Sequence, residues 1–245
     1  MIKGPFWLDS SPASFPPTHL ASTDPEGLLA IGGELTPEWL MQAYSNGIFP
    51  WFNPDEPILW WSPNPRSVLP INALKIRRSL KKRIRQYARD HQLKVTFDTH
   101  FRQVMQSCAQ MPREGQSGTW ITDEMLRAYS KMHQMGYAHS VEVWLDDKLC
   151  GGLYGIQIGK MFFGESMFSK QADTSKIALV ALSHQLQAWG FEIIDCQVET
   201  PHLNSLGAIQ IHRTDFEDRI HRLSQQSFPA QKWQANQTWL DAVCA

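Results

Sequence analysis

The hydrophobic positions in the second half of the chain follow a strand period over three neighbouring segments. Residues 139–145 alternate between apolar and polar side chains, and the segments 149–158 and 161–168 follow closely. The intervening residues, 146–148 and 159–160, are rich in Asp, Gly and Lys and are typical of turns. The pattern therefore predicts an antiparallel meander of three strands.

Helical patterns lie on both sides of this meander. Thr122 is a suitable N-cap for a helix that runs to residue 134, and Gly136 provides its C-terminal stop. A second helix is expected over 173–189, and it leads into an apolar strand over 191–198. Together these elements predict an α+β fold class with a central, mostly antiparallel sheet.

The N-terminal part of the chain is different, because it is rich in proline, glycine and tryptophan. A short helix is expected over 36–44, with Thr36 as its N-cap and Pro37 at its first position. Aromatic segments bounded by prolines follow this helix. We therefore expect a small N-terminal α/β subdomain over residues 1–64 and a larger domain over residues 65–245.

Composition adds few constraints. The chain has 42% hydrophobic and 19% charged residues, and no apolar run is long enough to span a membrane. The segment Met1–Pro5 lacks the apolar stretch of a signal peptide. A soluble cytoplasmic protein is therefore expected. A zinc site or a disulfide framework is not expected, because the four cysteines have no paired spacing: Cys108, Cys150, Cys196 and Cys244.

Charge is strongly segregated along the chain. Residues 1–64 contain one base and seven acids, which gives a net charge of −6. Residues 65–94 contain ten bases and one acid, which gives a net charge of +9. Such asymmetry favours a polyanionic partner more strongly than the overall charge could.

Most of these bases lie in a predicted helix over 74–89. Its apolar stripe consists of Leu80, Ile84 and Ala88, and its other face is basic without interleaved acids. Like charges along a helix repel, so a phosphate backbone is the expected partner, although a solvated helix face is the alternative. The candidate phosphate-binding residues are Arg78, Lys81, Lys82, Arg85 and Arg89.

A carboxylate interrupts the third strand of the meander. Glu165 lies between the apolar pairs Phe162–Phe163 and Met167–Phe168. Burying a carboxylate is costly unless it is paired or functional. We interpret Glu165 as a residue that recognises a cationic amine of the substrate, and a buried structural ion pair is the alternative.

A second polar group interrupts the last predicted strand. Because side chains alternate between the two faces of a strand, Asp195 and Gln197 are expected on one face and Cys196 on the other, within the apolar layer. Glu199 would extend the polar row if the strand continued. The Asp195 and Gln197 pair favours positioning of a nucleophile, whereas a purely structural carboxylate is the alternative for Asp195.

The order of helix, meander, helix and strand resembles that of acetyltransferase-like (GNAT-type) acyl-transfer domains. Acetyl-CoA users of that fold hold the pyrophosphate with a glycine-rich loop before the central helix. The corresponding segment here, residues 169–176, contains no glycine. The sequence therefore favours acyl transfer from a carrier other than CoA.

Several long motifs resemble those of the bacterial leucyl/phenylalanyl-tRNA–protein transferases. The resemblance extends from Pro25 to Asp215, and aromatic residues make the motifs specific. The motifs are GLLAIGG at 27–33, GIFPWF at 47–52, ILWWSP at 58–63, GTWI at 118–121, HSVEVW at 139–144, FGESMFS at 163–169, Ser175-Lys176 with Ala178-Leu179, and DCQ at 195–197.

This resemblance implies an aminoacyltransferase that uses Leu-tRNA or Phe-tRNA, and methionine weakly. The amino acid passes to the N-terminal amine of a protein that begins with Arg or Lys, which marks that protein for degradation. The resemblance also implies no metal and no CoA. A monomer is expected, and the basic helix would bind the acceptor stem of the tRNA.

The resemblance assigns roles to individual residues. Asp195 and Gln197 would act on the attacking amine, and Glu165 would line the site as a third catalytic residue. Leu153 and Leu182 stand where other members carry Met and Phe, so the preference between Leu and Phe stays open. The residues implied to bind the aminoacyl-adenosine or its side chain are Phe49, Trp51, Trp120, Leu153, Ser169 and Leu182.

Two other functions stay open at this point. A CoA-dependent N-acetyltransferase would share the predicted fold, and binding of acetyl-CoA would reveal it. A non-catalytic RNA-binding module would explain the basic helix alone, but it would leave Asp195 and Gln197 without a role.

Overall fold

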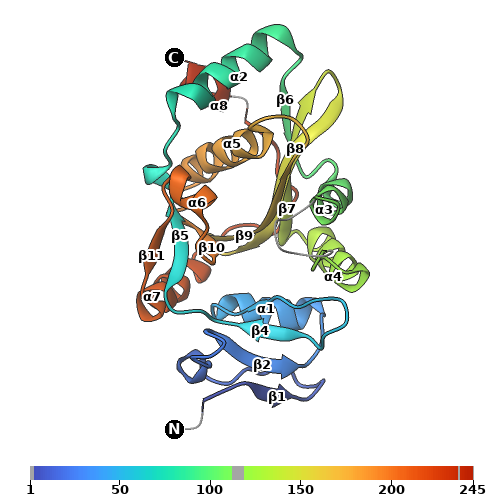
Figure 1. Ribbon diagram of the computed structural model, residues 1–245, viewed down its shortest axis with the longest axis vertical. Helices are drawn as coiled ribbons and strands as arrows, with labels where there is room; N and C mark the ends of the chain where they lie inside the picture. The colour runs from blue at the N-terminus through green and yellow to red at the C-terminus, as the bar shows by residue number, and fades with distance from the viewer. Residues whose placement is uncertain (1–2, 112–118, 237, 245) are drawn as a thin grey trace.

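The computed structural model describes residues 3–111, 119–236 and 238–244, and the chain forms two sheets (Figure 1). The smaller sheet is N-terminal, and its strand order is β1-β2-β4-β3. Helix α1 (Pro37–Ser45) connects β2 to β3 along the chain. The strands of this sheet are β1 (Phe6–Leu8), β2 (Leu28–Gly32), β3 (Phe49–Pro50) and β4 (Leu59–Trp61).

The larger sheet has the order β11-β5-β10-β9-β8-β7-β6. All of its neighbouring strands are antiparallel except the pair β9 and β10, so the expected α+β class with a mostly antiparallel sheet is confirmed. Its strands are β5 (Arg66–Pro70), β6 (Lys94–Phe97), β7 (Ala138–Leu145), β8 (Lys148–Ile158), β9 (Met161–Ser169), β10 (Ile193–Gln197) and β11 (Ile209–Ile211).

Helices cover both faces of this sheet (Figure 1). One face carries α5 with α2 and α8 beyond it, and the opposite face carries α3 and α4, which continue into the core beneath the small sheet. Short 3-10 turns cover Thr18–Leu20 and Ile71–Ala73. The remaining helices are α2 (Arg78–Asp90), α3 (Phe101–Ala109), α4 (Asp123–Gln134), α5 (Thr174–Ala188), α6 (Pro201–Leu206), α7 (Arg213–Ser224) and α8 (Thr238–Cys244).

Local capping explains why two helices begin where the sequence predicts. The Thr36 hydroxyl accepts a hydrogen bond from the Trp39 N–H at 3.4 Å, and the Thr122 hydroxyl accepts one from the Met125 N–H at 3.2 Å. Each bond satisfies an N–H that the first turn of a helix leaves without a partner. Gly136 follows α4 with a φ of 80°, which a residue without a Cβ adopts freely.

The basic helix differs from its prediction in two respects. It begins at Arg78 rather than at residue 74, because the Lys75 N–H bonds to the carbonyl of Leu206 and holds the preceding segment in an extended path. Its buried side chains are Leu80, Ile84 and Tyr87, whereas Ala88 is exposed. The predicted stripe was therefore wrong at its last position.

Two β-bulges lie next to each other in the middle of the large sheet. Between β8 and β9, Tyr154 pairs with Ser166 and Gly155 pairs with Gly164, so Glu165 is the extra residue. Between β5 and β10, Cys196 is the extra residue in the same way. Bulges redirect side chains and interrupt pairing, and they are common beside active sites.

The parallel pairing of β9 and β10 ends at these bulges. It joins Ile194 to Phe162 and Asp195 to Phe163, and no further pair follows among the described residues. The segments that contain Glu165 and Gln197 are therefore not hydrogen-bonded to each other as strands. The separation of two central strands leaves room for a ligand within the sheet.

Strand β10 also ends earlier than predicted. It stops at Gln197, and Val198 is 42% exposed rather than part of the apolar layer. Gln197 has a φ of 57°, which takes the backbone out of the extended conformation. Glu199 therefore does not continue the polar row; its carboxylate instead accepts hydrogen bonds from Asn204 and Gln210.

Gly155 allows β8 and β9 to approach each other at the Glu165 bulge, which leads to a stability prediction. A Cβ at this position would overlap the carbonyl oxygen of Phe163 and the ring of Phe162. We expect Gly155→Ala to lower the free energy of unfolding by about 1–3 kcal/mol, measured by chemical denaturation. Gly164→Ala is the matched control, since its Cβ would lie 3.5 Å from the nearest atom. Equal stabilities of the two variants would contradict this account.

Candidate active site

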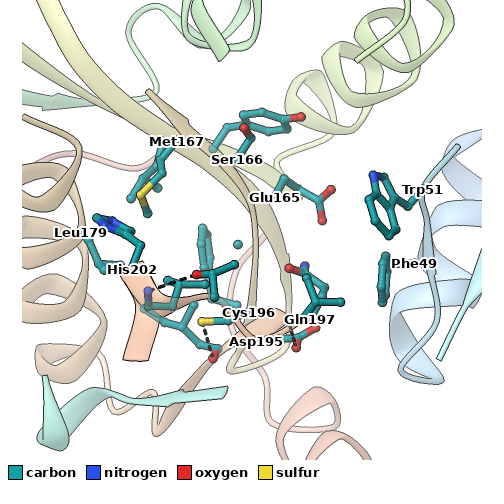
Figure 2. A pocket seen from close by; sticks show the side chains of 18 of the residues that line it. Phe49, Trp51, Glu165, Ser166, Met167, Leu179, Asp195, Cys196, Gln197 and His202 are labelled. Carbon is teal, nitrogen blue, oxygen red and sulfur yellow. Dashed lines mark hydrogen bonds between the residues drawn. The ribbon is translucent and has the colours of Figure 1, made fainter. Parts of the chain in front are cut away.

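A cavity of about 330 Å³ opens where β9 and β10 separate (Figure 2). Its walls come from α5, α6, β8, β9, β10 and the segment that includes β3 of the small sheet. One wall is apolar and includes Leu153, Phe162, Met167, Leu179, Leu182 and Ile194. The cavity can therefore hold an apolar group of side-chain size next to polar groups at its edge.

Most of the residues that the sequence singled out line this cavity, although they come from distant parts of the chain. Trp51 is 38% exposed at its edge, whereas Trp120 is buried. Gly118, which belongs to the same motif as Trp120, lies outside the described residues. The predicted residues that line the cavity are Phe49, Trp51, Trp120, Leu153, Glu165, Leu182, Asp195 and Gln197.

Ser169 is not among the residues that line this cavity. Its hydroxyl lies at the start of α5, where it accepts a hydrogen bond from the Ser175 N–H at 2.9 Å and donates one to the Ser175 hydroxyl at 2.8 Å. Ser169 therefore caps the first turn of α5, because a free helical N–H needs an acceptor.

Asp195 forms a buried ion pair that the sequence did not predict. The Arg66 Nε and Nη2 donate to the two oxygens of Asp195 at 2.8 and 2.7 Å, and both side chains are fully buried. Arg66 Nη1 donates to the Gly47 carbonyl at 2.9 Å. The guanidinium lies between the rings of Phe49 and Phe216, at 4.8 and 4.5 Å from their centroids.

Gln197 is held at the cavity edge by the same carboxylate. Its backbone N–H donates a hydrogen bond to Asp195 Oδ1 at 3.0 Å. This bond spans the bulge, where the backbone of Gln197 is in the left-handed conformation. Asp195 therefore accepts three hydrogen bonds, and its charge is balanced inside the protein by Arg66. This arrangement lets Asp195 fix the backbone position from which the Gln197 side chain enters the cavity.

Glu165 contacts two tyrosines instead of a cation. The Tyr44 hydroxyl donates to Oε1 at 2.6 Å and the Tyr129 hydroxyl donates to Oε2 at 3.1 Å. The two hydroxyl oxygens are 2.5 Å apart. Burial raises the pKa of Glu165 to about 7; the tyrosine hydroxyls oppose this rise, Asp195 adds to it, and Arg66 lowers it.

Cys196 and Ile194 belong to the apolar layer beneath α5, as predicted. The Cys196 thiol is buried, and both burial and the neighbouring Asp195 raise the pKa of its thiol. A thiol with a raised pKa is a poor nucleophile. Cys196 therefore forms part of the apolar wall of the cavity.

Sequence reasoning missed Arg66, Tyr44 and Tyr129. Arg66 belongs to the basic segment of the sequence, but it is also the first residue of β5, two positions before the buried Val68. A charged side chain that is buried in this way is usually paired. Tyr44 and Tyr129 lie on helices that were predicted, but neither carries a local pattern that indicates a contact with Glu165.

The basic residues of α2 lie away from the cavity lining. Helix α2 packs against the segment before α5, where the Tyr87 hydroxyl donates to the Ala172 carbonyl at 3.0 Å and Arg83 lies 3.9 Å from Asp173. Arg89 pairs with Asp90 at 2.6 Å. Lys81 is half-buried, and the predicted bases that are exposed are Arg78, Lys82, Arg85 and Arg89.

Two other features are absent from the part of the chain that the structure describes. Within 3–111, 119–236 and 238–244, no three His, Cys, Asp or Glu side chains are grouped so that they could hold a metal ion. Over the same ranges, no helix is both long and apolar enough to cross a lipid bilayer.

The cavity combines an apolar wall with an amide and a carboxyl group at its edge, and similarity to known proteins specifies the family. The model of the leucyl/phenylalanyl-tRNA protein transferase family matches residues 68–221, and that of its N-terminal domain matches residues 33–64. The chain belongs to the leucyl/phenylalanyl-tRNA–protein transferase family.

Individual relatives extend this similarity over nearly the whole chain. The protein named leucyl/phenylalanyl-tRNA–protein transferase from Hydrogenovibrio crunogenus is 60% identical over 238 residues, which cover 97% of this chain and 91% of that protein. The protein of the same name from Nitrosomonas europaea is 54% identical over 223 residues, which cover 91% and 92% of the two chains.

Solved structures show weaker likenesses. L-PGS from Bacillus licheniformis has a TM-score of 0.38 and 12% identity, over 73% of this chain and 56% of that chain. An aminoglycoside N-acetyltransferase in complex with CoA has a TM-score of 0.31 and 12% identity, over 56% and 90% of the two chains. Likenesses at this level carry no argument about function.

The Arg66 and Asp195 pair generates a prediction about stability. Asp195→Ala would leave the buried guanidinium without its counter-charge, and we expect the free energy of unfolding to fall by about 3–5 kcal/mol. Gln197→Ala is the matched control, because it alters the same cavity edge but keeps the backbone N–H. Chemical denaturation of both variants checks this, and a loss below about 1 kcal/mol for Asp195→Ala would refute the structural role of the pair.

Proposed function

We propose that the chain transfers leucine or phenylalanine, and methionine weakly, from an aminoacyl-tRNA to the N-terminal amine of proteins that begin with Arg or Lys. The reaction takes place in the cytoplasm and marks the acceptor for degradation. The observation that carries this proposal is the apolar cavity between β9 and β10, whose polar edge contains Glu165 and Gln197, in a chain of this family.

The cavity suggests how the donor binds. The leucine or phenylalanine side chain lies against Leu153 and Leu182 on the apolar wall. The terminal adenosine lies near Trp51 and Trp120, whose rings can stack on a base. The ester bond is then close to the polar edge, where an amine can approach it.

The chemistry needs little beyond positioning. The ester between the amino acid and the tRNA is already activated, so an amine that is held in line can attack without ATP. Gln197, fixed by Asp195, is placed to orient the amine or the developing oxyanion. Asp195 acts through this backbone contact and through Arg66 rather than by direct contact with the substrate.

CoA is a poorer candidate for the acyl carrier. Pyrophosphate sites use free N–H groups at the start of a helix. At the start of α5 the Ser175 N–H is already bonded to Ser169, and the Thr174 hydroxyl donates to the Cys150 carbonyl at 2.8 Å. The absence of glycine from 169–176 agrees with these side-chain contacts.

The preference for a basic acceptor depends on fewer acids than the sequence suggested. Asp195 is balanced by Arg66, and Glu199 is hydrogen-bonded outside the cavity lining. Glu165 is the acid at the cavity edge whose partners are hydroxyl groups. Glu165 is therefore the acid that lies nearest to a bound acceptor, and the negative charge that favours a basic first residue is modest.

Acceptor selectivity is the direct test of this function. We expect labelled Leu-tRNA to transfer its leucine to a peptide that begins with Arg and not to the same peptide beginning with Ala. Scintillation counting of the separated peptide measures the transfer. Acetyl-CoA with the Arg peptide serves as the control for the rival acetyltransferase. Equal labelling of both peptides would remove the acceptor part of the proposal.

The second test concerns the tRNA contact of α2. We expect the combined change of Arg78, Lys82 and Arg85 to Ala to weaken binding of every tRNA alike, because phosphate contacts carry no sequence information. The slope of log affinity against log salt should become shallower by about 2–3, at about 0.7–0.9 per lost contact. Filter binding over a range of salt concentrations measures it.

The matched control is Arg222→Ala, which removes an exposed base on α7 that pairs with Glu192. Its salt slope should equal that of the wild type. A triple variant with an unchanged slope would mean that the basic face of α2 is solvated and binds no phosphate.

A further inference from the structure

One carboxyl group and two hydroxyl groups form a closed ring of three contacts at the edge of the cavity. The hydroxyl of Tyr44 on α1 lies 2.5 Å from the hydroxyl of Tyr129 on α4. The carboxyl group of Glu165 on β9 lies 2.6 Å from the Tyr44 hydroxyl and 3.1 Å from the Tyr129 hydroxyl. Each contact is within hydrogen-bond distance, so each needs one proton. The ring joins the N-terminal subdomain to the large sheet.

The number of protons depends on the state of Glu165. With an ionised carboxylate, the two tyrosines supply two protons for three contacts. With a protonated carboxyl group, Glu165 can donate to Tyr129, Tyr129 to Tyr44, and Tyr44 back to Glu165. The ring is then complete, because every member donates one hydrogen bond and accepts one.

We propose that Glu165, supported by Tyr44 and Tyr129, is the proton acceptor of the transfer reaction. This inference rests on the proposed function. Glu165 is the catalytic residue, because its carboxyl group lines the cavity, and the tyrosines are positioning residues that complete the ring when the proton arrives.

The neutral N-terminal amine attacks the ester carbonyl carbon, a C–N bond forms, and the bond from that carbon to the 3′ oxygen of the tRNA breaks. The nitrogen loses one proton to the Glu165 carboxylate, which closes the ring. Glu165 then returns a proton to the 3′ oxygen, so the products are an amide and a free hydroxyl.

The charged and titratable surroundings agree with this role. Asp195 raises the pKa of Glu165 and Arg66 lowers it, whereas burial has the largest effect and brings it to about 7. The pKa values of Tyr44 and Tyr129 are both raised by burial and by Glu165, and Tyr154 raises that of Tyr129 further. Both tyrosines therefore keep their protons, and Glu165 is the member that titrates near neutral pH.

Other groups at the cavity are less suited to accept the proton. The Asp195 oxygens are engaged by Arg66, and Gln197 is an amide without a basic site. Burial lowers the pKa of His202 and so favours its neutral form, which can accept a proton. In Figure 2, however, it lies on the side of Leu179, across the cavity from Trp51. Glu165 and Gln197 lie on the side of Trp51.

The test is the pH dependence of single-turnover transfer from Leu-tRNA. The acceptor is an Arg peptide whose terminal amine is replaced by a hydrazide, which stays neutral throughout the range, so its own titration does not contribute. We expect the wild-type rate to rise with pH through an inflection near 7, because the ionised carboxylate is the active form. Glu165→Gln should lose this inflection and about 10²–10⁴-fold in rate.

Glu165→Gln is suited to this test because a glutamine can still complete the ring, by donating to Tyr129 and accepting from Tyr44. Its unfolding free energy should therefore be preserved, which separates a chemical role from a structural one. Tyr44→Phe should move the inflection to higher pH, since the hydroxyl bond that favours the carboxylate is lost. His202→Gln is the control and should keep the wild-type inflection.

Different results bear on the transfer reaction and on the role of Glu165 in it. Absence of transfer by the wild type to the Arg peptide with its natural amine, at every pH, would refute the proposed function itself. Transfer by Glu165→Gln with an unchanged inflection, or loss of the inflection in His202→Gln, would overturn the assignment of Glu165 and leave the proposed function intact.

Discussion

The buried pair between Arg66 and Asp195 is the interaction on which the site depends. It joins β5 to β10 within the large sheet, and through the carbonyl of Gly47 it also holds the segment that leads to the small sheet. A buried guanidinium is tolerated only if its donors and its charge are satisfied, so the positions of all three segments are coupled. Because Asp195 also accepts the Gln197 N–H, this same pair fixes the polar edge of the cavity. The aromatic rings on either side of Arg66 keep water away and make the coupling stronger.

A second constraint comes from the two bulges. A strand that alternates strictly would place Phe162 and Met167 on opposite faces, because five positions separate them. In the structure both belong to the apolar layer beneath α5, because the extra residue Glu165 shifts the alternation by one. The bulges therefore do two things at once: they turn Glu165 toward the cavity edge, and they end the pairing of β9 with β10 so that a cavity exists. A regular sheet with the same side chains would have neither feature.

The sequence predicted those parts of the fold that depend on neighbouring residues. Thr36 and Thr122 cap their helices, and the alternating segments form the meander, because caps and turns act within a few positions. It could not predict contacts between Arg66 and Asp195, or between Tyr44, Tyr129 and Glu165, since these residues are far apart along the chain. The motifs identified most of the residues that line the cavity, but a motif does not show what each residue contacts. Ser169 illustrates this: it belongs to a motif, yet its hydroxyl caps α5.

The two carboxyl groups of the site differ in what surrounds them, and this difference suits them to different tasks. Asp195 faces a cation that is itself buried, so a change in its protonation would leave Arg66 unpaired. Glu165 faces hydroxyl groups, which can either donate or accept and so can adapt to a carboxylate or to a carboxylic acid. Placing one carboxyl group in a rigid charge pair and another in an adaptable ring is a general way to obtain structural and acid–base roles from one residue type. Only the second arrangement allows a proton to come and go while the surrounding fold stays unchanged.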